Sequence, residues 1–335
     1  MNQFFYNVLG WINSLVGSWG VAMIIFTILI RLLLTPLDFK SRVSMRKTQK
    51  LQPQIQALQK KYANDKEKLN AKTAELYKKE HINPLSSCLP LLLTWPILII
   101  IFGAMRMAAN EQLLIQVGNI LANDPVNYPV KLEQFLWIKN LWMPDNIFSC
   151  AYPTVDTLRT ITDANLWNNF VARLNTIDPT LYGKLNLVAD PFASANLADT
   201  ATKIVEYMKG LGTYNFDNTN LSLNLLIAQW TVPNVFNGLL ILPILSGLTQ
   251  IVMTKITTAG QPQQPAANGQ PNTGKFMQWF FPIFSVVICL GYSAIFALYW
   301  VTGNLVSMGQ TVIINKMLDK KEQMAAPVAG EGTVK

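Results

Sequence analysis

The stretch Phe26-Thr27-Ile28-Leu29-Ile30-Arg31-Leu32-Leu33-Leu34-Thr35-Pro36-Leu37 decides the fold, because it ends an apolar segment long enough to cross a bilayer. Its arginine is the first charged residue of the chain. A mid-helix arginine costs about 2.5–3.5 kcal/mol in insertion assays, so Arg31 is expected to face protein or water rather than lipid. Two alternatives remain open: snorkelling toward the interface, and pairing with Asp38 seven residues on. Thr27, Arg31 and Thr35 recur every four residues, which predicts one polar face on an otherwise apolar helix.

The composition places the whole chain in the membrane-protein class. Half of the 335 residues are hydrophobic and only 14% are charged, and several apolar runs approach 20 residues. Residues 38–84 carry 12 Lys/Arg against 5 Asp/Glu, whereas residues 107–236 carry 7 against 11. The positive-inside rule therefore places 38–84 in the cytoplasm, and the acidic segment, one crossing later, outside.

These patterns predict an all-α integral membrane protein with five transmembrane helices, its N-terminus outside and its C-terminus in the cytoplasm. A helical hairpin follows the first span, and an insertion separates the second span from the third. The predicted parts are an interfacial amphipathic helix (1–17), the first transmembrane helix (18–37), a basic cytoplasmic hairpin (38–84), the second transmembrane helix (85–106), an extracytoplasmic insertion (107–235), the third transmembrane helix (236–254), a cytoplasmic loop (255–275), the fourth (276–291) and fifth (292–314) transmembrane helices, and a cytoplasmic tail (315–335).

Several local features leave alternatives open. Residues 1–17 have one apolar face, which suits a helix lying in the membrane interface or an extension of the first span. In the hairpin, Asn64 followed by Glu67 predicts a capping box, and Pro53 predicts a kink or a helix start. The basic charge of the hairpin suits a solvated surface, a contact with anionic lipids or a contact with ribosomal RNA. Arg106 is expected to end the second span.

The insertion gives no sign of catalytic chemistry. Its pattern predicts short helices over 111–122, 165–174 and 200–210, separated by Pro, Asn and Asp clusters. It has no nucleophile elbow and no Gly-rich phosphate loop, and the three cysteines of the chain have no CxxC spacing. We therefore expect no metal, no cofactor and no enzymatic activity.

Four stretches carry a family resemblance. They are residues 30–37 with 50–56; residues 76–85 with Cys88, Pro90 and Pro96; residues 242–245 with Gly247; and residues 298–300 with 304–306 and Gln310. In this order, joined by a basic hairpin, they resemble the YidC/Oxa/Alb family of membrane protein insertases. The resemblance covers about 20–106 and 236–316. The insertion is much longer than is usual in single-core members, and residues 288–293 replace the family's Phe-Pro-x-Gly turn.

The resemblance implies a bacterial plasma-membrane insertase and chaperone with a hydrophilic groove open to the cytoplasm. Its partners would be nascent membrane proteins, anionic lipids, the ribosome through 38–84, and the Sec translocon, but not DNA. Two other classes remain open from the residues alone: a small-solute transporter, and a scaffold for an extracytoplasmic partner. The predicted groove residues are Arg31, Thr27, Thr35, Gln250, Tyr299, Trp300 and Asn304.

Overall fold

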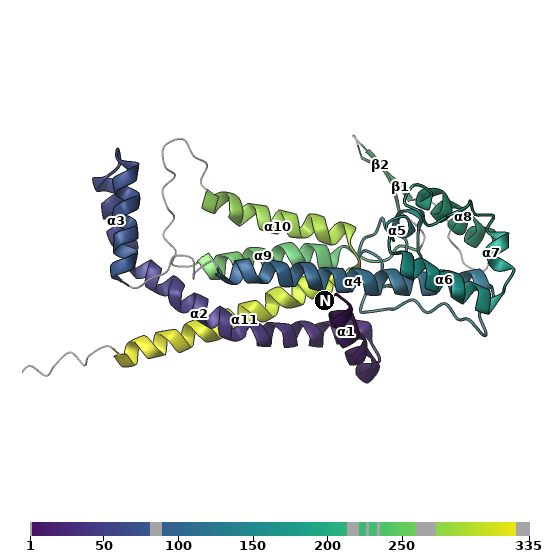
Figure 1. The fold of residues 1–335 in the computed structure, drawn as a ribbon, viewed down its shortest axis with the longest axis horizontal. Helices are drawn as coiled ribbons and strands as arrows, with labels where there is room; N and C mark the ends of the chain where they lie inside the picture. Colours follow the sequence, from purple (N-terminus) through teal and green to yellow (C-terminus); the bar gives the residue numbers. More distant parts are fainter. Residues whose placement is uncertain are drawn as a thin grey trace, which may run out of the picture. The chain divides into compact units, whose positions relative to one another are not determined.

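A computed structural model describes residues 2–80, 89–212, 221–225, 228–232, 235–258 and 273–325. The chain is predominantly helical over these residues, as predicted (Figure 1). Part of the motif at 76–85, together with Cys88, most of the loop 255–275 and the end of the tail, lies outside the described residues. The elements are α1 (Asn2–Val16), α2 (Trp19–Lys61), α3 (Lys66–Lys79), α4 (Leu89–Ala122), α5 (Val155–Leu158), α6 (Ala164–Ile177), α7 (Leu181–Lys184), α8 (Leu197–Gly210), β1 (Leu221–Leu225), β2 (Ala228–Val232), α9 (Ile241–Thr258), α10 (Thr273–Gly291) and α11 (Ala294–Ala325).

Three helices run well past the predicted ends of their spans. Helix α2 joins the first span to the first arm of the hairpin and continues through Pro36 and Pro53, so Pro53 does not start a helix. Helix α4 continues 16 residues beyond Arg106, and α11 includes the first part of the predicted tail. Charged residues mark where an apolar run ends, but Lys, Arg, Gln and Glu are good helix formers and do not end the helix itself.

The N-terminal helix is separate from the first span. Helix α1 ends at Val16, and Gly17 follows with φ +70, a left-handed conformation that suits glycine at a helix end. Helix α1 is therefore not an extension of α2. Its buried face carries Leu9 and Ile12, whereas Phe4 and Trp11 are about two-thirds exposed. Such an exposed apolar stripe suits a membrane interface, which remains our prediction for this helix.

The hairpin forms, but a different residue caps its second helix. The carboxylate of Asp65, not the side chain of Asn64, accepts the backbone N–H of Lys68 at 3.0 Å and caps α3. The predicted capping box was therefore wrong by one position, because Asp65 is itself a strong N-cap residue. Leu51 and Ile55 of α2 are buried against Leu76 and Tyr77 of α3, which closes the hairpin over a small apolar cluster.

The chain divides into two compact units, which are described separately. The first unit comprises Met1–Phe26, Ile99–Leu248 and Pro282–Val301, and the second comprises Thr27–Leu98, Thr249–Phe281 and Thr302–Lys335. The predicted insertion belongs to the first unit. The hairpin and most of α11, from Thr302 onward, belong to the second unit.

The insertion is a packed helical subdomain. Helices α5 to α8 gather around the C-terminal half of α4 (Figure 1), and their buried side chains form one hydrophobic core. Trp167 lies at its centre with 0% exposure, stacks on Phe192 with ring centroids 4.6 Å apart, and donates its indole N–H to the carbonyl of Ile161 at 2.7 Å. The predicted helices over 165–174 and 200–210 correspond to α6 and α8, and 111–122 is the end of α4.

A buried carboxyl group joins the insertion to the start of α9. Asp145 has 0% exposure and accepts the backbone N–H groups of Leu239 at 2.8 Å and Leu242 at 2.7 Å, and the indole N–H of Trp137 at 3.1 Å. Gly238 leaves room for it, since a Cβ there would lie 2.0 Å from Asp145 Oδ1. Helix α9 accordingly begins at Ile241, five residues after the predicted start of the third span.

One short β-hairpin departs from the all-helical prediction within the described residues. Strands β1 and β2 pair antiparallel, with Leu221 opposite Val232 and Leu225 opposite Ala228. By length and composition, two described helical segments are long and apolar enough to cross a membrane, Trp19–Lys61 and Pro96–Ala122. The apolar segments of α9 and α10 are shorter. The five-span arrangement therefore remains a prediction.

Candidate functional site

The arginine of the opening stretch lies against the last helix, inside the second unit. Arg31 of α2 is partly buried, and a Cβ at Gly303 of α11 would lie 3.1 Å from its Nη2 atom. The guanidinium therefore packs on bare helix backbone at Gly303, and any larger residue there would require the guanidinium to shift. Arg31 makes no salt bridge within 4.0 Å among the described residues, although the carboxylate of Asp38 is near enough to interact with it electrostatically.

Gln310 of α11 connects this helix to α2 at the turn between Arg31 and Thr35. Its side-chain N–H₂ donates to the carbonyl of Arg31 at 2.9 Å and to the hydroxyl of Thr35 at 2.7 Å. Thr35 in turn donates to the same Arg31 carbonyl at 3.1 Å. The polar face predicted from the spacing of Arg31 and Thr35 is thus turned toward α11 over this turn.

The contacts continue toward the ends of both helices. The guanidinium of Arg42 donates to the hydroxyl of Thr311, and that of Arg46 donates to the carbonyl of Asn315 at 3.0 Å. Further along, Arg46 pairs with Asp319 at 2.7 Å and Lys50 pairs with Glu322 at 3.2 Å. We call this row of contacts, from Arg31–Gly303 to Lys50–Glu322, the polar seam. Residue numbers rise together on both helices, so α2 and α11 run parallel along it.

Two side chains in the polar seam keep unused hydrogen-bonding capacity. Among the described residues, the hydroxyl oxygen of Ser307 and the side-chain oxygen of Gln310 are buried without a hydrogen-bond partner. Buried polar atoms are normally paired, because leaving one unpaired costs about 1–3 kcal/mol. These two unpaired atoms of α11 mark a place that water or a polar ligand can satisfy.

The other predicted groove residues divide between the two units. Thr27 of α2 is fully buried. Asn304 of α11 donates to the hydroxyl of Thr249 on α9 at 3.1 Å, and the neighbouring Gln250 is partly buried. These residues belong to the second unit with Arg31.

Tyr299 and Trp300 lie on α11 within the first unit. Tyr299 is buried at 7% exposure, and Trp300 is partly buried with its ring 5.7 Å from that of Phe296. The indole N–H of Trp300 is buried without a hydrogen-bond partner among the described residues.

A polar cavity of about 340 Å³ opens beside the charged part of the polar seam. Arg42, Arg46, Lys50 and Glu322 line it together with Ile256 and Thr257 of α9. Arg31 does not line this cavity, so this cavity is not the predicted groove around Arg31. It gives the hairpin end of the second unit a recess whose charged lining is mainly cationic.

Sequence reasoning missed three of the residues that form the site. Gly303, Ser307 and Gln310 were not predicted as groove residues, although Ser307 shares a helix face with Asn304. The sequence does indicate a polar face of this helix, because Trp300, Asn304, Ser307 and Thr311 recur at steps of four, three and four residues. The acidic partners of Arg46 and Lys50 gave no such signal, because they lie some 270 residues away in sequence.

Comparison with known proteins identifies the family. The family model described as "60Kd inner membrane protein" matches residues 11–322, which is nearly the whole chain. This chain belongs to the YidC/Oxa/Alb family. Its YidC-type relatives match mainly in shorter segments, as the following three show.

A protein named "Membrane protein insertase YidC" from Fusobacterium nucleatum is 45% identical over 106 residues, covering 32% of this chain and 52% of the relative. Proteins of the same name from Clostridium tetani and Anaeromyxobacter dehalogenans are 38% identical over 151 residues and 36% identical over 141 residues. These matches cover 44% and 42% of this chain, and 60% and 22% of the relatives. The chain thus spans less than two thirds of the length of each.

Proposed function

We propose that this chain is a membrane protein insertase. It moves short polar segments of nascent membrane proteins across the bilayer through a groove open to the cytoplasm, and releases their apolar helices sideways into lipid. The names of its relatives and its membership of an inner-membrane family support this proposal. The single observation that carries it is Arg31 beside Gly303 in a polar seam that retains unpaired buried atoms.

The chemistry of the seam suits a transient polar guest. Arg31, which forms no direct salt bridge among the described residues, attracts acidic residues in a client's tail, and this attraction grows where the effective dielectric is low. The unpaired oxygens of Ser307 and Gln310 accept hydrogen bonds from water or from the client's backbone N–H groups. Burial of the client's apolar helix in lipid then supplies the driving force for its sideways release.

The proposal also keeps Tyr299 and Trp300 of α11 from the set predicted from the sequence. The indole N–H of Trp300 offers a donor to a client carbonyl, and Tyr299 lies next to it on α11. Thr27, Thr35, Gln250 and Asn304 supply the remaining polar lining. This assignment keeps the full set predicted from the sequence and adds Ser307 and Gln310.

The parallel seam also supports the proposed topology. Because α2 and α11 run in the same direction, the basic hairpin and the end of α11 lie at the same end of the second unit. The positive-inside rule assigns that end to the cytoplasm. We therefore propose a multi-pass protein of the bacterial plasma membrane with a cytoplasmic C-terminus and an extracytoplasmic insertion.

The proposed partners follow from the same placement. Nascent membrane proteins are the substrates. The hairpin is closed by the apolar cluster of Leu51, Ile55, Leu76 and Tyr77. Its many Lys and Arg residues present a cationic surface to the ribosome and to anionic lipids. The Sec translocon is the remaining partner in this proposal.

The test is complementation of a bacterial strain depleted of its own insertase. We expect Arg31→Ala to lose insertion of substrates with acidic N-terminal tails, and Arg31→Lys to retain part of it. Arg159→Ala is the matched control, because that arginine is exposed and pairs with Asp156 at 3.0 Å in the insertion. Full rescue by Arg31→Ala with acidic-tailed substrates would contradict the electrostatic role.

Proteoliposomes separate the insertase from a transporter. Purified full-length protein should insert a single-span client without added solute gradients, and small-solute flux should stay at the level of empty vesicles. Solute flux that depends on Arg31, without client insertion, would favour the transporter class instead.

A further inference from the structure

We propose that a cavity in the first unit binds an anionic phospholipid, with the phosphate at Arg106 and an acyl chain along an aromatic wall. The cavity has a volume of about 480 Å³ and is formed by α4, the loop before α6 and the turn between α10 and α11. This size is within the usual range of ligand pockets. The site is separate from the polar seam, and the inference does not depend on the insertase proposal.

The apolar part of the cavity is a cluster of aromatic rings. Phe102 of α4 packs edge-on against Tyr292 and Phe296, with ring centroids 4.8 Å and 5.2 Å away. Ile288 and Val287 of α10 continue this wall, and Val287 is 61% exposed. A rigid aromatic and aliphatic wall that stays open suits a hydrocarbon chain, because each buried CH₂ group contributes about 0.8 kcal/mol.

The polar end of the cavity is one arginine. Arg106 is exposed, and one of its N–H groups donates to the carbonyl of Thr160 at 3.2 Å. No carboxylate pairs with it among the described residues. A guanidinium has five N–H donors, so several remain to bind two oxygens of a phosphate.

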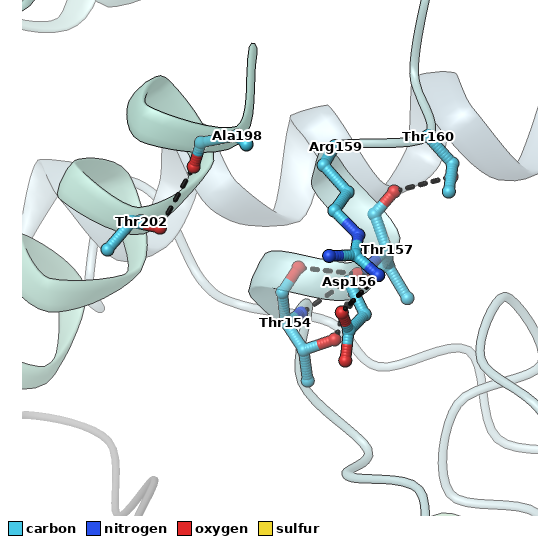
Figure 2. Close-up of polar contacts among 7 residues, drawn as sticks. All are labelled: Thr154, Asp156, Thr157, Arg159, Thr160, Ala198 and Thr202. Atoms are coloured by element: carbon cyan, nitrogen blue, oxygen red, sulfur yellow. Dashed lines mark hydrogen bonds and ion pairs between the residues drawn. The ribbon is translucent and has the colours of Figure 1, made fainter. Parts of the chain in front are cut away.

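The rim that holds Arg106 is itself fixed. Thr154 and Thr157 form a reciprocal cap at the start of α5, and the hydroxyl of Thr160 donates to the carbonyl of Thr157 at 2.7 Å (Figure 2). The same picture shows Arg159 paired with Asp156 at 3.0 Å. The insertion therefore neutralises Arg159 internally and leaves Arg106, at the cavity, to an external anion.

The position of the cavity favours a lipid over a soluble anion. Phe102, Met105, Arg106 and Ala109 all belong to the apolar segment Pro96–Ala122, which is long enough to cross a membrane. A free phosphate would satisfy Arg106 but leave the aromatic wall empty. A zwitterionic lipid brings a second cation close to the guanidinium. An anionic headgroup with an attached chain matches both ends of the cavity.

Photocrosslinking with phosphatidylglycerol that carries a diazirine in one acyl chain tests the proposal on the full-length protein in detergent micelles. We expect crosslinks to map to peptides containing Phe102 and Ile288. Arg106→Gln should lower their yield about tenfold, as for loss of a charged hydrogen bond. Gly291→Phe should abolish them, because a Cβ at this lining position meets nothing within 4 Å and the ring can enter the cavity.

Two matched variants serve as controls. Arg159→Gln removes an exposed arginine of the same insertion, and Gly183→Phe adds a ring at an exposed glycine that also has open space around it. Both should give the wild-type yield. Equal yields in all five proteins would overturn the site, as would a loss in the controls as large as in the two cavity variants.

Competition identifies the ligand class. Unlabelled phosphatidylglycerol should displace the probe at least tenfold better than phosphatidylcholine, and inorganic phosphate should not displace it at all. Equal displacement by phosphatidylcholine would overturn the role of the anionic headgroup. Displacement by phosphate alone would overturn the lipid as the ligand. Circular dichroism of each variant confirms that a lost crosslink reflects the site and not unfolding.

Discussion

The insertion core and the polar seam differ in how completely their buried polar groups are paired. In the insertion, Trp167 is fully buried and its indole N–H has a partner at 2.7 Å, so the centre of the core is apolar and satisfied. Among the described residues, the insertion leaves one buried side-chain atom unpaired, the Nε of Arg173 on α6. In the seam, Arg31 has no ion pair, and Ser307 and Gln310 keep unpaired buried oxygens among the described residues. At the centre of the insertion core, the side chain of Trp167 leaves no polar atom free to bind solvent or a ligand. The polar seam retains binding capacity at some cost in stability.

This contrast predicts that the two regions respond differently to substitution. Variants in the insertion should change the free energy of unfolding of that subdomain and leave client insertion through the seam intact. Variants in the seam should change insertion activity more than stability. The following predictions are ordered by their expected effect on stability.

Trp167→Ala should destabilise the insertion most. Truncating a buried tryptophan costs about 3–5 kcal/mol, through lost burial and the cavity that remains. Hydrogen exchange in the full-length protein should speed up in α6 and α8, while the seam segments of α2 and α11 keep their protection. Trp11→Ala, at a 62% exposed position, is the control. Loss of protection in the seam as well would show that the two regions are not independent.

Asp145→Ala should have the next largest effect. It removes a buried acceptor of three hydrogen bonds and leaves the N–H groups of Leu239 and Leu242 unpaired, at a cost of about 2–4 kcal/mol. We expect proteolysis to begin in the loop before α9. Asp156→Ala, whose side chain is 79% exposed, should change nothing measurable. If both variants resisted proteolysis equally well, Asp145 would not be needed to hold the start of α9.

Gln310→Leu should separate stability from activity. It removes two hydrogen bonds between α2 and α11, which in membrane proteins contribute about 0.6 kcal/mol each on average. Thermal stability should fall only slightly, while insertion of acidic-tailed clients falls severalfold. Leu305→Ala, at a 53% exposed position of the same helix, should leave insertion unchanged. Wild-type insertion by Gln310→Leu would remove this residue from the site.

The smallest effect concerns Asp178, on the surface of the insertion. The backbone N–H and hydroxyl of Thr180, together with Lys184, lower the pKa of Asp178 to about 2. Because the folded pKa is depressed below the unfolded value of about 3.9, its contribution is present above pH 4 and is lost as the pH falls through 2. Carboxyl NMR should show this midpoint, and Lys184→Met should move it upward. An unchanged midpoint in that variant would exclude a role of Lys184.

The sequence best predicted properties of short segments, namely which segments are helical and which face of α2 is polar. The spacing of Thr27, Arg31 and Thr35 indicated the face of α2 that meets α11 over the turn at Arg31, and composition indicated helices almost throughout. Helix ends were predicted less well, since the charges after residue 37 and at Arg106 mark the end of an apolar run and not of a helix. The cap of α3 was wrong by one residue because Asn64 and Asp65 are both good N-cap types and only backbone geometry selects between them.

The membrane character of the chain, its helices and the unusual charge at position 31 follow from the sequence alone, because hydrophobicity, periodicity and the cost of a mid-helix cation are properties of short segments. The partners of that charge followed only from the tertiary structure. Gly303 and Gln310 lie more than 270 residues from Arg31, and Asp145 meets the start of α9 across more than 90. Such pairings depend on how helices pack against each other, and no local pattern specifies which distant residue will fill a given gap.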